Sequence, residues 1–174
     1  MSVPRRRRTV EALAASRGWR YRRRAPLAEV VPRPHRFLLF AGQHRNAVAH
    51  VVGGAAGDRE IQIFDCRLST VALIRHPGLS PGRFVITARR EWWIAPGRPS
   101  ADGRFYLFAD DPSSLEPLLA GEVGRYLRRP FRGPAHLEVK DRTALVCHGR
   151  VCEDNWARLV DAAIGLAALI APSS

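Results

Sequence analysis

The stretch RFYLFADDPSSLEPLLAGEVGRYL, Arg104 to Leu127, decides the fold because it predicts a strand that runs directly into a capped helix. Its first part, FYLF, is a short apolar and aromatic run, typical of a strand covered on both faces. Asp111 before Pro112 is a helix-start signal, since the carboxylate accepts hydrogen bonds from free backbone amides and proline fits the first helical turn. Pro117 lacks an amide hydrogen and therefore predicts a kink or a short first turn.

On both sides of this unit, short apolar runs alternate with turn residues. Strands are predicted at Trp19–Arg22, Arg36–Phe40, Asn46–Val52, Glu60–Leu68, Thr70–Arg75 and Arg83–Thr87, with a hairpin formed by residues 135–139 and 143–147. Helices are predicted at Val10–Arg17, ended by Gly18, and from Asp154 towards the C-terminus, with one helical turn at Pro26–Val31. Residues 1–8 are predicted to be a basic disordered tail. The rest, 9–174, is predicted to be one α+β domain with a mainly antiparallel sheet of about six to eight strands and N-terminal, central and C-terminal helices.

Apolar spacing in the central unit, the hairpin and the last helix predicts one buried cluster. Its expected members are Phe105, Leu107, Leu115, Leu118, Leu119, Leu137, Val139, Leu145, Leu159, Val160 and Ile164. A chain of 174 residues is long enough to bury a core of this kind.

Positive charge is concentrated at the N-terminal end. Residues 1–45 contain twelve arginines and two glutamates, so they hold +10 of the net charge of +12. Arginine neutralises phosphate, and the interleaved Trp19 and Tyr21 could stack on bases. We therefore predict a polyanion-binding surface formed by Arg5, Arg6, Arg7, Arg8, Arg20, Arg22, Arg23 and Arg24. The alternative is that the two aromatic rings pack in the core while the arginines form a solvated face.

The cysteines and apolar runs bear on the cellular compartment. Cys66, Cys147 and Cys152 cannot all pair with one another, and no secretory signal precedes them, which indicates a reducing cytoplasm. The longest apolar run, residues 162–171, is too short to span a bilayer. A cytoplasmic location is expected, with a peripheral position at the inner face of the membrane as the alternative.

Four segments resemble a family of uncharacterised proteins from high-GC Gram-positive bacteria. They are LAASRGWRY (Leu13–Tyr21), VVGG with REIQIFDCRL (Val51–Leu68), FYLFADDPSSLEPLL (Phe105–Leu119), and LEVKDRTALV with its closing helix (Leu137–Ile170). The resemblance implies no assigned activity. Some relatives have a transmembrane helix just before the basic segment, whereas this chain opens with Arg5 to Arg8.

Other chemistry-bearing residues favour packing over catalysis. Cys147, His148 and Cys152 could supply zinc ligands, but their spacing matches no standard zinc finger. Strand alternation also places the side chain of Cys147 inward and that of His148 outward. We therefore expect no metal and no cofactor. The glycines at 53–57 lack the Lys-Ser/Thr ending of a phosphate loop and predict a hairpin turn. Trp92 and Trp93 face opposite ways in a strand, so one ring is a possible contact surface.

These observations favour a non-catalytic binding or scaffold domain that docks on nucleic acid, an anionic membrane surface or a partner protein. The competing hypothesis is an enzyme of unknown chemistry with a pocket near the 95–103 loop.

Overall fold

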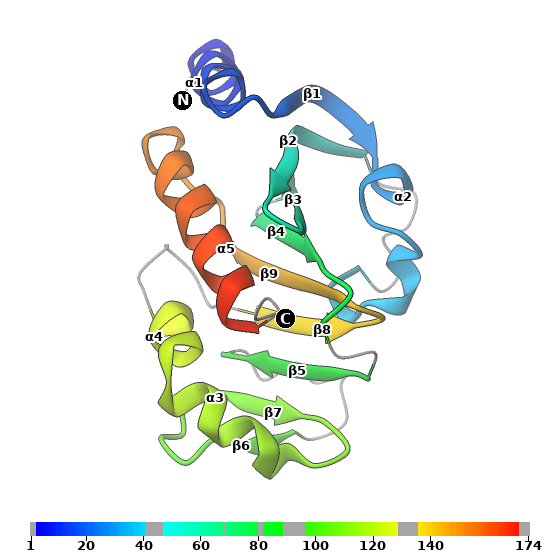
Figure 1. Ribbon diagram of the computed structural model, residues 1–174, viewed down its shortest axis with the longest axis vertical. Helices are drawn as coiled ribbons and strands as arrows, with labels where there is room; N and C mark the ends of the chain where they lie inside the picture. Colours follow the sequence, from blue (N-terminus) through cyan, green and yellow to red (C-terminus); the bar gives the residue numbers. More distant parts are fainter. Residues whose placement is uncertain are drawn as a thin grey trace.

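The computed structural model describes residues 3–40, 47–67, 69–79, 82–88, 97–128 and 136–170. In this part of the chain, nine strands form one antiparallel sheet in the order β1-β2-β3-β4-β9-β8-β5-β7-β6 (Figure 1). They are β1 (Arg20–Pro26), β2 (Ala47–Ala56), β3 (Arg59–Cys66), β4 (Ser69–Arg75), β5 (Phe84–Thr87), β6 (Arg98–Pro99), β7 (Tyr106–Phe108), β8 (His136–Lys140) and β9 (Thr143–Gly149). The single α+β domain with an antiparallel sheet is thus confirmed.

Helices cover both faces of the sheet. The α-helices are α1 (Val3–Ser16), α2 (Leu27–Val30), α3 (Glu116–Ala120), α4 (Glu122–Arg128) and α5 (Trp156–Ile170). Short 3-10 turns are η1 (Pro34–Arg36), η2 (Leu38–Phe40), η3 (Pro112–Leu115) and η4 (Glu153–Asn155). Buried residues of α1, α3, α4 and α5 pack on one face, and those of α2, η2 and the chain between them pack on the other.

The core is therefore two clusters separated by the sheet. The first cluster contains nearly all of the predicted core, but Leu118 and Ile164 are only partly buried at its border. Leu145 is fully buried in the second cluster, on the opposite face. The prediction of one cluster therefore holds except for Leu145, which lies on the opposite face because neighbouring residues of a strand face opposite ways.

The second cluster depends on a segment whose structure was predicted wrongly. Residues 36–40 form 3-10 turns instead of a strand. Phe37 and Phe40 are three residues apart, which places them on the same side of a 3-10 turn, and both are buried against the sheet. Pro34 lies in the first turn of η1, where its missing amide hydrogen is not needed.

The central strand and helix form as predicted at their junction. The Asp111 carboxylate accepts a hydrogen bond from the Ser113 amide at 3.0 Å, which confirms the helix cap. Pro117 lies in the first turn of α3, and the helix is interrupted later, at Gly121, whose backbone is extended. The strand, β7, lies near the sheet edge, and only Leu107 in it is fully buried, so the expected cover on both faces was wrong.

Gly124 brings α3 and α4 close together. A Cβ atom at this position would overlap the carbonyl of Leu119, so only glycine permits the approach. Because α4 is short, the burial of Val123, Tyr126 and Leu127 in the first cluster, rather than helix propensity, holds the element in place.

The N-terminal segment differs from the predicted tail. Helix α1 begins at Val3, so Arg5 to Arg8 lie on a helix that packs on the sheet through Val10 and Ala14. Gly18 follows the helix with a positive φ of 65°, as expected for a residue that ends a helix.

Candidate polyanion-binding surface

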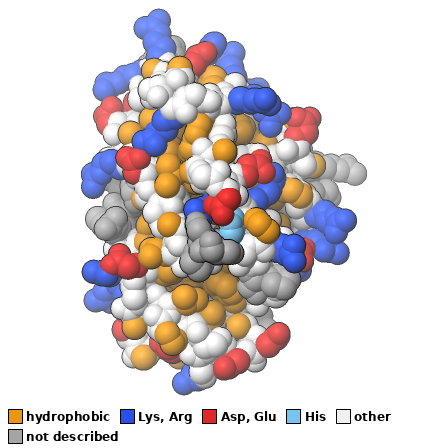
Figure 2. All heavy atoms as spheres, viewed as in Figure 1, with side chains coloured by type: hydrophobic (Ala, Val, Ile, Leu, Met, Phe, Trp, Pro, Cys, Tyr) orange, Lys and Arg blue, Asp and Glu red, His pale blue; other side chains and the backbone are white. Residues whose placement is uncertain are grey.

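Strand β1 ends the sheet in the described part of the chain and carries four exposed arginines. They are Arg20, Arg22, Arg23 and Arg24. Its sheet neighbour is β2, and no other described strand pairs with it. In Figure 2, Lys and Arg side chains stand out around the upper end of the molecule, where Figure 1 shows α1 and β1. The first strand is thus a charged and accessible edge.

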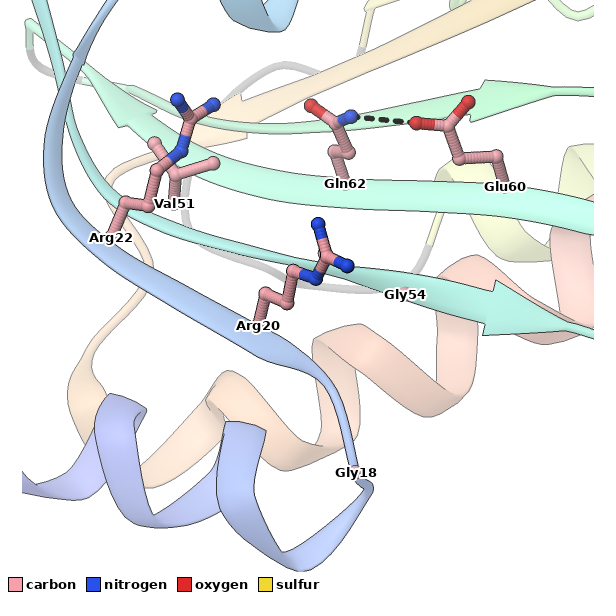
Figure 3. Close-up of a pocket in the computed structure, with 8 residues that line it drawn as sticks. Gly18, Arg20, Arg22, Val51, Gly54, Glu60 and Gln62 are labelled. Atoms are coloured by element: carbon pink, nitrogen blue, oxygen red, sulfur yellow. Dashed lines mark hydrogen bonds between the residues drawn. The ribbon is translucent and has the colours of Figure 1, made fainter.

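A groove of about 520 Å³ lies on the sheet beside this edge, and we call it the β1 groove. It is lined by Gly18, Arg20, Arg22, Val51, Gly53, Gly54, Glu60 and Gln62. Arg20 pairs with Gly53, which in turn pairs with Gln62. A Cβ atom at Gly53 would lie 3.1 Å from the Gln62 Cγ atom, so the absent side chain leaves the space open. Figure 3 shows Arg20 and Arg22 reaching from β1 over β2 towards the side of Gln62 and Glu60.

The polar groups of the groove leave a cation and an acceptor available. Gln62 donates through Nε2 to Glu60 at 2.8 Å, and Arg22 donates to Glu29 at 3.0 Å. The buried Oε1 atom of Gln62 has no hydrogen-bond partner among the described residues, and Arg20 has no ion pair among them. The groove therefore suits an anionic group that also carries a hydrogen-bond donor.

Arg6 does not belong to this surface. Its side chain is buried, with 2% of the residue exposed. Nε and Nη2 each donate to an Asp65 oxygen at 2.8 Å, and Nη1 donates to the Val151 carbonyl at 2.6 Å. The guanidinium also lies 5.4 Å from the ring centre of Trp156. Arg6 faces the interior, so the prediction that it belongs to the polyanion-binding surface was wrong.

The other arginines of α1 are only partly available. Arg5 lies 3.5 Å from Asp154, and Arg7 lies 3.4 Å from Glu11, four residues along the helix. Arg8 is exposed and has no ion pair within the described ranges. Arg8 is therefore the α1 arginine best able to join those of β1.

The aromatic residues predicted to stack on bases contact the protein instead. Trp19 is half-buried and lies over Gly54, where a Cβ atom would overlap its ring. The Tyr21 hydroxyl is 3.1 Å from Nδ1 of His50, a buried residue with φ of 52° in the irregular part of β2. Burial raises the pKa of Tyr21 and lowers that of His50. Trp19 and Tyr21 thus hold β1 against the sheet, and the arginines are the side chains of β1 that remain exposed to a ligand.

The remaining sequence candidates lie elsewhere. Cys147 and His148 are buried and Cys152 is half-buried; His148, predicted to face outward, lies against Tyr126. Within the described ranges, no three His, Cys, Asp or Glu side chains are grouped closely enough to hold a metal ion. Trp92 and Trp93 lie outside the described residues. The described part of the 95–103 loop contains β6, and none of its residues lines the β1 groove.

Sequence reasoning missed the floor of the groove. Gly53 and Gly54 were predicted to open a turn, but they lie inside β2, and the turn comes at Gly57 and Asp58. Glycine inside a strand is a signal of close approach or of missing side-chain volume, and here it marks both.

Comparisons with known proteins bear on the fold. No family model matches the chain, and no curated protein matches it in sequence. Among solved structures, the chain is similar to the crystal structure of the mycobacterial trehalose monomycolate transport factor A, TtfA, with a TM-score of 0.69. The two chains share 12% sequence identity, and the match covers 97% of each. At this identity the likeness concerns the fold alone. Across the described residues, no helix has the length and apolar character needed to cross a membrane.

Proposed function

We propose that this chain is a non-catalytic binding domain that docks on a polyanion through the arginines of β1 and Arg8. The observation that carries the proposal is the charged edge: four exposed arginines lie on one seven-residue strand, and among the described residues only Arg22 of the four forms an ion pair. Cations held on a rigid strand lose little freedom when they bind an anionic surface.

An anionic membrane surface is the polyanion that these contacts favour over single-stranded nucleic acid. Single-stranded nucleic acid is held by charge together with stacking on aromatic rings. Trp19 and Tyr21 are occupied by Gly54 and His50, so charge remains without the stacking. Charge alone is sufficient at a lipid surface, where each arginine contributes about 1 kcal/mol.

The structural neighbour is compatible with this proposal. TtfA is described as a transport factor, a role that does not require catalysis by the domain itself. We also propose that the chain belongs with the uncharacterised proteins of high-GC Gram-positive bacteria that it resembles, since the neighbour comes from such an organism. The corresponding location is the cytoplasm, at the inner face of the membrane, with a protein partner there as a further binding possibility.

The test replaces Arg23 and Arg24 by alanine, because both are exposed and neither holds an ion pair in the described part of the chain. Binding is measured by sedimentation with vesicles of phosphatidylserine and phosphatidylcholine, with vesicles of phosphatidylcholine alone, and by titration with a random-sequence duplex. We expect binding to the anionic vesicles that weakens with salt, and roughly thirtyfold weaker binding for the double variant.

The matched control replaces Arg98 in β6 and Arg104 just before β7, two exposed arginines at the opposite end of the sheet from β1, by alanine. This variant loses the same charge and should bind vesicles nearly as well as the original chain. Stronger binding to the duplex than to vesicles, with a salt slope of ~0.9 per neutralised phosphate, would move the proposal to nucleic acid. Absence of binding to all three targets at low salt would refute it.

A further inference from the structure

The turns of two hairpins, β2–β3 and β8–β9, together with the end of β4 and the segment after α2, surround a second hollow, of about 710 Å³. It is lined by Pro32, Arg33, Arg36, Phe37, Asp58, Glu60, Arg75, His76, Pro77, Asp141, Arg142 and Thr143, and we call it the hairpin hollow. In Figure 2, Lys and Arg side chains gather at the right-hand rim at mid-height, on the side where Figure 1 shows the β8–β9 turn. Four arginines and three acidic residues face this one space.

Strained backbone is concentrated at the hairpin hollow. In the described part of the chain, five non-glycine residues have positive φ, and three of them line the hollow: Arg33 (50°), Asp141 (50°) and Arg142 (59°). Asp141 and Arg142 form a two-residue hairpin turn with both residues left-handed, a turn in which glycine is strongly preferred at the second position. Arg142 at the second position of this turn supplies a guanidinium group but leaves the backbone strained. Strained backbone of this kind is typical of functional sites.

The ion pairs of the hollow hold some of its charges and leave others available. Arg36 donates to Asp141 at 2.9 Å, and Arg75 donates to Glu60 at 2.9 Å. His76 is buried, and its Nε2 lies 2.8 Å from Asp58. Three acidic groups are thus matched by three partners at the wall of the hollow.

Two further cations remain without such partners. Arg33 and Arg142 are exposed and have no ion pair among the described residues. The Nε atom of Arg75 is buried and lacks a hydrogen-bond acceptor within the described ranges. A group with several anionic oxygens suits Arg33 and Arg142, because guanidinium groups bind such oxygens in pairs.

We infer that the hairpin hollow is a binding site for an oxyanion, a phosphate or phosphomonoester group, held by Arg33 and Arg142. The wall formed by Arg36, Asp141, Arg75 and Glu60 keeps these two arginines in position. The hollow is larger than a single phosphate, and the apolar Pro32 and Phe37 in its lining suit the organic part of a phosphorylated small molecule. This site shares Glu60 with the β1 groove and no other lining residue, and the inference does not depend on the proposed function.

The test titrates the full chain by calorimetry with inorganic phosphate and with glycerol 3-phosphate, at fixed ionic strength in chloride buffer. Arg142→Gly removes the guanidinium and also relieves the turn. We expect phosphate binding to weaken at least about tenfold, while the melting temperature of the unliganded protein rises by about 2–4 °C. A purely structural arginine would instead lower the melting temperature when it is removed.

Arg67→Gly is the matched control. Arg67 is also exposed, also has positive φ (53°), and lies in the β3–β4 turn without lining the hollow. It should give a similar rise in melting temperature with unchanged phosphate binding. Arg33→Gly is the second variant at the hollow, should Arg142→Gly fail to fold, and it should weaken phosphate binding as strongly.

The outcomes show which kind of phosphate the hollow binds and whether the inference is correct. Tighter binding of glycerol 3-phosphate than of phosphate assigns an organic phosphate, and equal binding assigns the phosphate group alone; both support the site. The inference is overturned if the original chain binds neither probe at low salt, or if Arg67→Gly weakens binding as much as Arg142→Gly. Vesicle binding should be unchanged in Arg142→Gly, so this site and the proposed function can fail independently.

Discussion

The imidazole of His148, the most deeply buried histidine among the described residues, makes the stability of this protein depend on pH. His148 in β9 has 1% of its surface exposed, and its Nε2 lies 3.4 Å from the Tyr126 hydroxyl. Burial lowers the pKa of His148 to about 4, because the charged form loses its water. In the unfolded chain the same side chain takes up a proton near pH 6.5. Stability from this group is therefore complete above pH 6.5 and is lost as pH falls towards 4.

We expect His148→Gln to flatten the pH dependence of unfolding between pH 7 and pH 4.5. In the original chain, His148 lowers the free energy of unfolding by ~3 kcal/mol as the pH falls from 6.5 to 4, since one pKa unit corresponds to about 1.4 kcal/mol. Urea denaturation at several pH values measures the slope. His35→Gln is the control, because His35 is exposed on η1, and it should leave the slope unchanged. Equal slopes for the original chain and His148→Gln would contradict this account.

At the scale of elements, α1 is attached to the sheet by a buried polar network. Arg6 in the helix binds Asp65 in β3, and Asp65 also accepts a hydrogen bond from Thr70 in β4 at 2.8 Å. The Thr70 hydroxyl accepts a hydrogen bond from the Val151 amide at 3.0 Å. The network joins α1, two strands and the segment before α5, and each buried charge in it has a partner.

Arg6→Ala should destabilise the protein by about 3–5 kcal/mol, because Asp65 would remain buried without its cation. Arg7→Ala, one residue along the same helix, removes an exposed pair with Glu11 and should change stability by less than about 1 kcal/mol. Chemical denaturation measures both. The double variant Arg6→Ala/Asp65→Ala should be less destabilised than the sum of the single variants, since the unpaired charge is then gone. A small effect of Arg6→Ala would mean that α1 is held by its apolar face alone.

The sequence predicted those elements that are determined by residues close to one another in the chain. The Asp111 cap, the hairpin of β8 and β9 and the α2 turn follow from neighbouring residues, and the structure contains them. The start of α1 could not be predicted, because consecutive arginines are typical of a solvated tail. What orders this segment is Asp65, 59 residues away in the sequence. The missed turns at 36–40 have the same origin, since they form over a sheet face that residues from β2, β3, β4 and β9 create.

At the scale of the whole molecule, one sheet separates two cores that contribute to stability from opposite sides. Leu119 lies in the first cluster, with 2% exposed, and Leu145 lies in the second, fully buried. Leu119→Ala and Leu145→Ala should each cost ~2–5 kcal/mol. Because the two side chains are in different clusters, their effects should add in the double variant. Urea denaturation checks this, and a loss below about 0.5 kcal/mol for either variant would place that residue outside the core.

Both candidate sites arise only from the complete topology. The charge of β1 could be read from the sequence, but the β1 groove needs Gly53 and Gln62 from two other strands. The hairpin hollow is assembled from turns at residues 33, 58, 76 and 142, which no local pattern connects. Sequence reasoning therefore identified the charged strand and missed the spaces beside it.

The edge of β1 that pairs with no described strand also bears on how copies of this chain meet one another. Unpaired backbone groups on an outer strand attract a second copy, and like charges along that strand repel it. The charges of Arg20, Arg22, Arg23 and Arg24 place this repulsion on the edge itself, so they disfavour pairing between the β1 edges of two copies. An anionic surface that covers these arginines removes the repulsion and concentrates the protein in two dimensions. Docking and lateral clustering would then be two consequences of the same strand.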